Sequence, residues 1–438
     1  MTLEILKSEF DLFKKVSFQG SIESSQLIQY RPTTAISEST TIEFDIPTSS
    51  DEYLDLQNIF LSVKGKLVRQ NGTNFPADQD NRFSLIQYAL NTMFDQLSIY
   101  LNGTLISQSS KTYHYLSFIE ALTQYGIDHW TTILKSAGAR PTFEDDTHNF
   151  DNIDTELSSL TNRSKEFSLY GKIHGSIFNT DKLLLNGVTL HLEFTRAQIT
   201  FSTIGLAAQA AAIEAAEPKM NLSDVILYVR KVKPSPTLLT AHAKALGISK
   251  AIYPIKRTLV KTINLPANQS TFVLDNVFMG QIPCKMIIGL VSNAAYAGSY
   301  TTNPLAFKNY GLNFICVHLN GESYPKTPYE PDFQVASARY EREYYEFHSN
   351  LGTITSSIQI HIDFIQYKDG YCLFAFNFNS DYENPNENEY INIPKEGFLS
   401  IEVKFRAALA NALKMIVYAQ FDNIIEIDEQ RNVTVDFS

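Results

Sequence analysis

One histidine and one aspartate stand close enough in the sequence to share chemistry. In the segment SIQIHIDF, His361 and Asp363 are two residues apart. If this segment is a strand, both side chains lie on the same face, because side chains alternate between the two faces of a strand. An acid and a base placed in this way can exchange a proton. The sequence offers no further partner that would complete a catalytic site, so we do not predict one here.

A second group of chemically interesting residues is the acidic segment DDTHNFDNID, residues 145–154. Its carboxylates are spaced like those of a calcium loop, but it lacks the glycine and the closing glutamate that an EF-hand requires. A solvated insertion is therefore the favoured interpretation. The chain also lacks a Walker A loop, a dinucleotide fingerprint, His-Glu-x-x-His and Gly-x-Ser-x-Gly. We predict no catalytic residue, no cofactor and no metal site, and we expect no enzymatic activity.

The other residues of types that could do chemistry are expected to have structural roles or to lie on the surface. His191 and His318 lie on predicted strand faces opposite the apolar residues, where histidines are commonly exposed. The cysteines have no metal-like spacing and are expected to be small buried hydrophobes in a reducing compartment: Cys284, Cys316 and Cys372. The run YEREYY, residues 340–345, can stack a ligand, but it is more typical of a helix packed on a sheet or of an interface.

Composition limits the class of protein. The chain has 438 residues, which fits two β domains of about 200 residues each. It contains 29 Phe and 23 Tyr, residue types that favour strands. Its net charge is −11 and no basic tail is present, so sequence-specific binding of nucleic acid is not expected. We expect no signal peptide and no transmembrane segment, because no apolar run is long enough.

Two alternating segments indicate how the chain is built. In residues 188–194, VTLHLEF, four apolar side chains point one way: Val188, Leu190, Leu192 and Phe194. In residues 397–405, GFLSIEVKF, the same pattern recurs in Leu399, Ile401, Val403 and Phe405, at an offset of 211 (399 − 188). Strict alternation is the mark of a strand with one buried and one wet face. We therefore predict that both sets point into sandwich cores.

Other segments repeat in the same order. LSIYLNG (97–103) matches ICVHLNG (315–321) at an offset of 218 (315 − 97), and each runs into Asn-Gly, a strong hairpin signal. VILYV (225–229) matches MIVYA (415–419) at 190 (415 − 225). We also pair Asp45-Ile46-Pro47 with Asn264-Leu265-Pro266, at 219 (264 − 45). The shared order favours a duplicated fold over chance similarity.

The predicted fold class is therefore all-β: two tandem eight-stranded jelly-roll sandwiches, a double jelly-roll, with short helices in loops. The predicted domains are an amphipathic N-terminal arm (1–15), a first jelly-roll (16–235) and a second jelly-roll (236–438). We expect helices at 83–94, 113–125, 240–246 and 329–351, and a strand at 358–367. Two insertions, residues 135–165 and 204–220, are expected to be loops at the sandwich ends, the second containing an Ala-rich helix.

Longer segments resemble a known family. They include IEFDIP, YLDLQNIFLSVKGKLV, DQLSIYLNGTLIS, KLLLNGVTLHLEF and NPLAFKNYGL. The stretches VRKVKPSPTLLTAHAKAL and FDNIIEIDEQRNV are the most specific, because sandwich packing alone does not require them. Over nearly the whole chain, the sequence resembles the major capsid proteins of Polinton (Maverick) elements and their adintovirus-type relatives.

This resemblance implies a major capsid protein that forms pseudo-hexameric homotrimers. The trimers would tile an icosahedral shell around double-stranded DNA. The implied partners are further copies of the chain and a penton or minor capsid protein. The implied location is the virion capsid, assembled inside the host cell, in the nucleus or the cytoplasm.

Two other classes of protein remain open from the residues alone. A receptor- or carbohydrate-binding β-sandwich, such as a spike or lectin-like module, would be expected to expose aromatic platforms and often to bind calcium. The single tryptophan, Trp130, and the poor calcium loop argue against it. An enzyme built on a β-sandwich is the third possibility, and the missing catalytic constellation argues against that.

Overall fold

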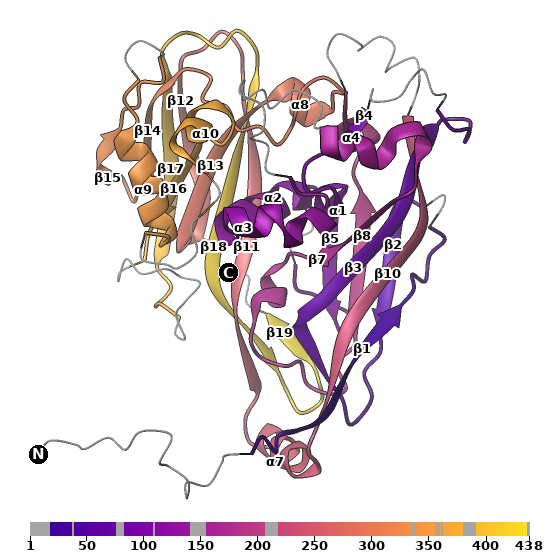
Figure 1. Ribbon diagram of the computed structural model, residues 1–438. Coiled ribbons are helices and arrows are strands. Elements are labelled where there is room, and N and C mark those ends of the chain that lie inside the picture. The colour runs from indigo at the N-terminus through magenta and orange to yellow at the C-terminus, as the bar shows by residue number, and fades with distance from the viewer. Residues whose placement is uncertain are drawn as a thin grey trace, which may run out of the picture.

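The chain folds into four main β-sheets, seen in a computed structural model (Figure 1). The structure describes residues 18–36, 39–75, 83–107, 110–140, 155–205, 218–334, 338–354, 360, 362–379 and 391–435. The N-terminal arm (1–15), the acidic segment 145–154, residues 206–217 of the Ala-rich segment and His361 lie outside these ranges.

The first half of the chain contributes two four-stranded sheets. The first sheet has the order β1-β10-β3-β7, with β1 (Ile22–Tyr30), β10 (Pro218–Pro234), β3 (Tyr53–Arg69) and β7 (Phe167–Lys172). The second has the order β2-β8-β5-β6, with β2 (Thr41–Ile46), β8 (Leu190–Arg196), β5 (Phe94–Leu101) and β6 (Thr104–Leu105). A short separate pair joins β4 (Phe83–Leu85) to β9 (Thr203–Gly205).

The second half repeats this arrangement. One sheet has the order β11-β18-β13-β16, with β11 (Ala251–Leu265), β18 (Leu413–Ile427), β13 (Lys285–Ser292) and β16 (Leu373–Asn377), and β19 (Val433–Val435) pairs with β18. The other has the order β12-β17-β14-β15, with β12 (Thr271–Gln281), β17 (Glu396–Phe405), β14 (Leu312–Leu319) and β15 (Glu322–Tyr329). With β4, β9 and β19 set aside, the described strands of each half follow the order 1-8-3-6 and 2-7-4-5. The chain is a double jelly-roll, as predicted.

The helices lie in the connections between strands, as expected. In the first half they are α1 (Ala89–Thr92), α2 (Tyr113–Gln124), α3 (Ile127–Thr131), α4 (Thr155–Thr161) and α5 (Ile199–Ser202), with the 3-10 turns η3 (Ile133–Ala137), η4 (Asn162–Ser164) and η5 (Ser176–Asn179). In the second half they are α7 (Pro236–Leu246), α8 (Asn293–Ala297), α9 (Glu341–Leu351) and α10 (Phe364–Asp369).

The predicted core residues point inward. Val188, Leu190, Leu192 and Phe194 are at most 1% exposed, and Leu399, Ile401, Val403 and Phe405 at most 4%. The intervening Glu193 and Glu402 are partly exposed on the opposite face. Alternation therefore identified both buried faces correctly. Both Asn-Gly turns also have the positive φ values of a type I′ hairpin: 46° and 80° at Asn102-Gly103, and 53° and 86° at Asn320-Gly321.

Several predicted elements were wrong. The pairing of residues 45–47 with 264–266 joins non-equivalent strands, because the first ends β2 and the second ends β11. The strand expected at 358–367 is replaced in part by α10, which begins at a capping box formed by Asp363 and Gln366. Residues 329–351 are helical only in α9, and residues 83–94 only in α1.

Candidate functional site

The junction between the two jelly-rolls is one part of the described chain where polar side chains are buried. Helix α2 lies between the two sandwiches, against β11 and β18 (Figure 1). It is buried along most of its length, because one side packs on its own jelly-roll and the other on the second. The Phe118 ring lies 6.5 Å from Phe307 and 6.4 Å from Tyr371, both in the second half. Aromatic contacts of this kind stabilise beyond simple burial.

A buried hydrogen-bond network crosses this junction. Glu120 on α2 is 0% exposed and His174 is 4% exposed. Nδ1 of His174 lies 2.9 Å from Oε2 of Glu120, and Nε2 of His174 lies 2.8 Å from the Tyr88 hydroxyl. The Tyr418 hydroxyl, from β18 of the second half, donates to Oε1 of Glu120 at 3.3 Å, and Nε2 of Gln420 donates to Tyr418 at 2.8 Å.

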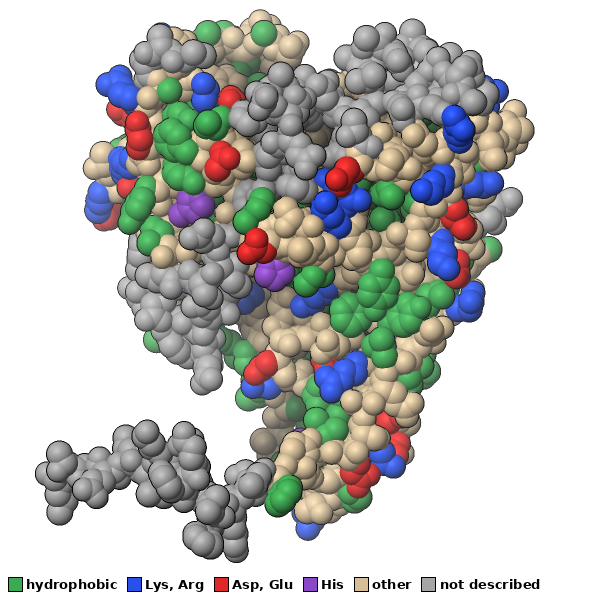
Figure 2. Space-filling view, viewed as in Figure 1, with side chains coloured by type: hydrophobic (Ala, Val, Ile, Leu, Met, Phe, Trp, Pro, Cys, Tyr) green, Lys and Arg blue, Asp and Glu red, His purple; other side chains and the backbone are tan. Residues whose placement is uncertain are grey.

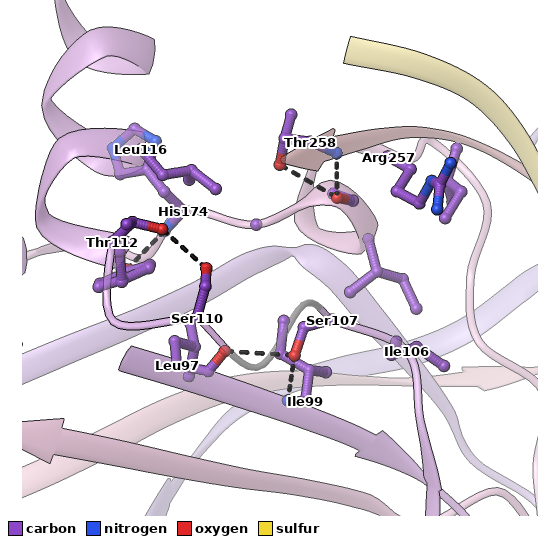
Figure 3. Close-up of a pocket in the computed structure, with 15 residues that line it drawn as sticks. Leu97, Ile99, Ile106, Ser107, Ser110, Thr112, Leu116, His174, Arg257 and Thr258 are labelled. Carbon is purple, nitrogen blue, oxygen red and sulfur yellow. Dashed lines mark hydrogen bonds between the residues drawn. The ribbon is translucent and has the colours of Figure 1, made fainter. Parts of the chain in front are cut away.

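This network has the form of an acid–histidine pair, but its surroundings favour a structural role. Burial raises the pKa of Tyr88 and of Tyr418 well above the usual range, so both hydroxyls stay protonated. The hollow beside His174 has a volume of only about 40 Å³, space for about one or two water molecules (Figure 3). It is lined by residues of both halves, including Thr112 and Thr258. A substrate has no room here, and the network links α2 to the second sandwich.

Further hydrogen bonds join the same two surfaces. The Ser176 hydroxyl, on η5, accepts from the backbone N–H of Thr258 on β11 at 3.0 Å (Figure 3). The Tyr253 hydroxyl, also on β11, accepts from the N–H of Leu185 and donates to the carbonyl of Leu183, both at 3.1 Å. Buried polar groups are costly unless they are paired, so these contacts fix the two halves in one arrangement.

Sequence reasoning did not single out Glu120 and His174. They are 54 residues apart, and no local motif joins them. One signal was visible: Glu120 is the only carboxylate in the segment YHYLSFIEALTQ, which is rich in apolar and aromatic residues, and a charged residue is rarely buried without partners. The partners themselves could not be named, because they come from two separate strand connections and from β18.

The residues that were singled out lie elsewhere. His191 and His318 are partly exposed on outer strand faces, as expected, and each meets a carboxylate of the neighbouring strand, Asp45 at 2.6 Å and Glu402 at 3.2 Å. Within the run 340–345, Tyr340 stacks on Phe364 of α10 at 4.4 Å, so packing explains this ring.

The three cysteines are free and buried, as predicted. Burial raises the pKa of Cys284 to about 12 and also raises that of Cys372, so these thiols are poor nucleophiles. The described residues contain no cluster of His, Cys, Asp and Glu suited to a metal ion. Among the described helices, none combines the length and the apolar character needed to cross a membrane.

We expect acid to destabilise the fold through His114. This residue lies on α2, with its ring 4.1 Å from Phe201 and 4.6 Å from Tyr115, and burial lowers its pKa to about 3. The unfolded chain takes up a proton near pH 6.5, whereas the folded chain does not, so stability falls as the pH drops through this window. Between pH 7.5 and 4.5 the expected loss from this group is about 3 kcal/mol.

Urea unfolding of the wild type and of His114→Phe at the two pH values tests this expectation. The variant should lose less stability on acidification, because its side chain takes up no proton in the unfolded state. The comparison at pH 7.5 isolates any packing cost of the substitution. Equal losses in the two proteins would show that His114 does not carry the effect.

The comparisons with known proteins concern the whole chain. No protein-family model matches it. An uncharacterized protein of Caenorhabditis elegans is 24% identical over 407 residues, covering 90% of this chain and 93% of that protein. A chain of the Sputnik virophage is 14% identical with a TM-score of 0.62, covering 100% of this chain and 93% of that one.

Two named capsid proteins are similar in structure. The Faustovirus major capsid protein has a TM-score of 0.58 and 11% identity, covering 96% of this chain and 92% of that one. The mavirus major capsid protein has a TM-score of 0.53 and 11% identity, covering 100% of this chain and 95% of that one. The present chain therefore has the double jelly-roll fold of viral major capsid proteins.

Proposed function

We propose that the protein is a major capsid protein of the Polinton or Maverick type, whose activity is assembly. The observation that carries this proposal is the repeated strand order, 1-8-3-6 and 2-7-4-5, in both halves of one chain. The likeness to solved capsid proteins over at least 96% of this chain supports it. Fold alone does not determine function, so the proposal also relies on the junction, which is built to hold two sandwiches rigidly and not to bind a substrate.

In this proposal three copies form a pseudo-hexameric capsomer with six jelly-rolls. Capsomers then tile an icosahedral shell around double-stranded DNA, in the virion capsid, after assembly inside the host cell. A penton or minor capsid protein would close the shell where six-fold packing fails. The two domains divide at residues 235 and 236, and the arm of residues 1–15 contacts neighbouring capsomers.

The alternative of an aromatic binding module is less well supported. Trp130 is 0% exposed, and its ring lies 6.1 Å from both Tyr88 and Phe118. A carbohydrate platform built on tryptophan requires an exposed ring, and Trp130 instead fills the core beside α2.

Sedimentation velocity of the purified protein at micromolar concentration tests the capsid proposal. We expect a stable trimer, because an obligate interface of more than about 2,000 Å² leaves few monomers. Electron microscopy of the same sample under assembly conditions should then show closed shells or sheets of capsomers. A protein that stays monomeric at micromolar concentration would contradict the proposal.

A further inference from the structure

One end of the first jelly-roll contains a cavity that residues of both its sheets line. The cavity has a volume of about 210 Å³ and lies where β8 ends at Arg196 and β10 begins at Pro218. Gln70, which follows the end of β3, and Met93, which precedes β5, also line it. Small-molecule sites are common at the open ends of β-barrels, and this end of the sandwich has the same form.

Most of the cavity wall is apolar. The apolar lining residues are Met93, Ala197, Ile199, Pro218, Met220 and Leu222. Three of them are buried: Met93, Pro218 and Leu222. An engineered apolar cavity of about 150 Å³ holds a benzene molecule, so this cavity has room for an apolar body of about six carbon atoms.

Arg196 places a positive charge in this apolar wall. Its Nη2 donates to the carbonyl of Ile36 at 3.1 Å, and its Nε is buried without a hydrogen-bond partner in the described chain. Burial lowers the pKa of Arg196, and no carboxylate of the described chain opposes that effect. The guanidinium nevertheless stays protonated, and a half-buried charge is costly without a partner. An anion in the cavity would supply that partner.

The corresponding end of the second jelly-roll is built without this charge. The position equivalent to Arg196 is Ala407, at the offset of 211 (407 − 196) that relates β8 to β17. Residues 406–412 join β17 directly to β18, and Leu409 in this connection is only 6% exposed. The same fold is therefore completed there by small and apolar residues, so the fold alone does not explain Arg196.

The surroundings favour a small anion with an apolar body over a nucleic-acid backbone or a bare oxyanion. Figure 2 shows Lys and Arg side chains interspersed with Asp and Glu, so the face in view has no continuous basic track for a nucleic acid. Inorganic phosphate would lose its water against the apolar wall without gaining hydrogen bonds there. A carboxylate on an aliphatic chain can pair with the guanidinium and also bury its chain.

We propose that this cavity binds a small aliphatic monocarboxylate with a body of about six carbon atoms. Arg196 holds the carboxylate, because its planar guanidinium presents pairs of N–H groups that match the two carboxylate oxygens. The buried side chains of Met93, Pro218 and Leu222 enclose the aliphatic chain. The site goes beyond the capsid function, and neither proposal depends on the other.

Isothermal titration of the purified full-length protein with hexanoate at pH 7.5 tests the proposal. We expect saturable binding of one hexanoate per chain. Hexanol lacks the charge and inorganic phosphate lacks the apolar body, so each should bind at least about 10-fold more weakly. Phosphate that binds as tightly as hexanoate would contradict the proposal, because the apolar wall would then contribute nothing. The absence of saturable hexanoate binding would overturn it as well.

Two matched substitutions locate the binding site. Arg196→Gln removes the charge and should weaken hexanoate binding at least about 10-fold. Its melting temperature without ligand should be equal to or above that of the wild type, because an unpaired, half-buried charge is lost. Arg406→Gln removes an exposed guanidinium at the corresponding end of the second jelly-roll and should leave the affinity unchanged. Equal losses of affinity in the two variants would show non-specific attraction of anions and overturn the proposal.

A third variant fills the cavity and keeps the charge. Ala197 lines the cavity and is partly exposed, so Ala197→Leu should fold, while its larger side chain takes the space of the aliphatic chain. This variant should no longer bind hexanoate saturably, although Arg196 is intact. Circular dichroism shows whether the variant is folded. A folded Ala197→Leu protein that binds hexanoate with wild-type affinity would place the ligand elsewhere and overturn the proposal.

Discussion

We expect Ile401→Asp to prevent the chain from folding. Ile401 is 0% exposed at the centre of β17, where it stands opposite Leu274 on β12 and Val317 on β14. The aspartate would bury a carboxylate among apolar side chains with no partner, and an ionised group in that setting costs several kcal/mol or more. A domain is stable by only about 5–15 kcal/mol, so this single change removes most or all of the stability. The variant should be insoluble, or soluble without the cooperative unfolding transition of the wild type.

Met279→Asp is the matched control for that variant. Met279 lies on β12, the strand next to β17, but its side chain is 72% exposed. The same charge on the wet side of the same sheet should change the free energy of unfolding by no more than about 0.5 kcal/mol. Circular dichroism and urea unfolding of the two variants compare them directly. A folded Ile401→Asp protein with a wild-type midpoint would mean that the inward face of β17 has been misidentified.

Alternation made the core of this protein readable from its sequence. Side chains alternate between the two faces of a strand. A strand with one exposed face and one buried face therefore shows alternating polar and apolar residues in the sequence, as in residues 188–194 and 399–405. The Asn-Gly turns were equally readable, since positive φ at two successive residues restricts the residue types. Together they placed equivalent strands, β8 with β17 and β5 with β14, and hence the duplicated fold.

Elements without such a pattern were missed. β1, IESSQLIQY, is exposed along most of its length, so it shows no regular apolar face. Without β1, the first strand recognised in the first half was β2, and its end at Ile46-Pro47 was paired with the end of β11. The helix α10 was missed because Ile360 and Ile362 precede it with strand-like spacing, while the capping box that starts it depends on a hydrogen bond between Asp363 and Gln366.

The junction was the least readable part of the chain. Its contacts depend on how the two sandwiches pack against each other. That packing does not produce a periodic pattern of apolar residues in the sequence. Glu120 alone gave a hint, as a carboxyl group on a buried helix. Tyr418 gave none, because an aromatic residue in a buried strand is ordinary, and only the structure shows that its hydroxyl meets Glu120 of α2.

We expect a second large loss of stability when the buried carboxyl group of Glu120 is removed. Glu120→Ala should lower the free energy of unfolding by about 3–5 kcal/mol. The substitution leaves both His174 and Tyr418 with buried polar atoms that lose a partner, and it opens a cavity between α2 and β18. Glu120→Gln is the matched control, because it keeps the size and one acceptor oxygen and should cost less. Urea unfolding at pH 7.5 gives the free energies.

A double-mutant cycle then measures whether the hydrogen bond between Glu120 and Tyr418 contributes to stability across the two jelly-rolls. Tyr418→Phe removes the hydroxyl on the second half, and Glu120→Ala removes its acceptor on the first. If the hydrogen bond acts across the junction, the double variant should be more stable than the sum of the single costs predicts, by about 0.5–3 kcal/mol. Strict additivity would mean that Glu120 stabilises only its own jelly-roll through His174. In that case the two halves would be held together mainly by the aromatic packing of Phe118 on Phe307 and Tyr371.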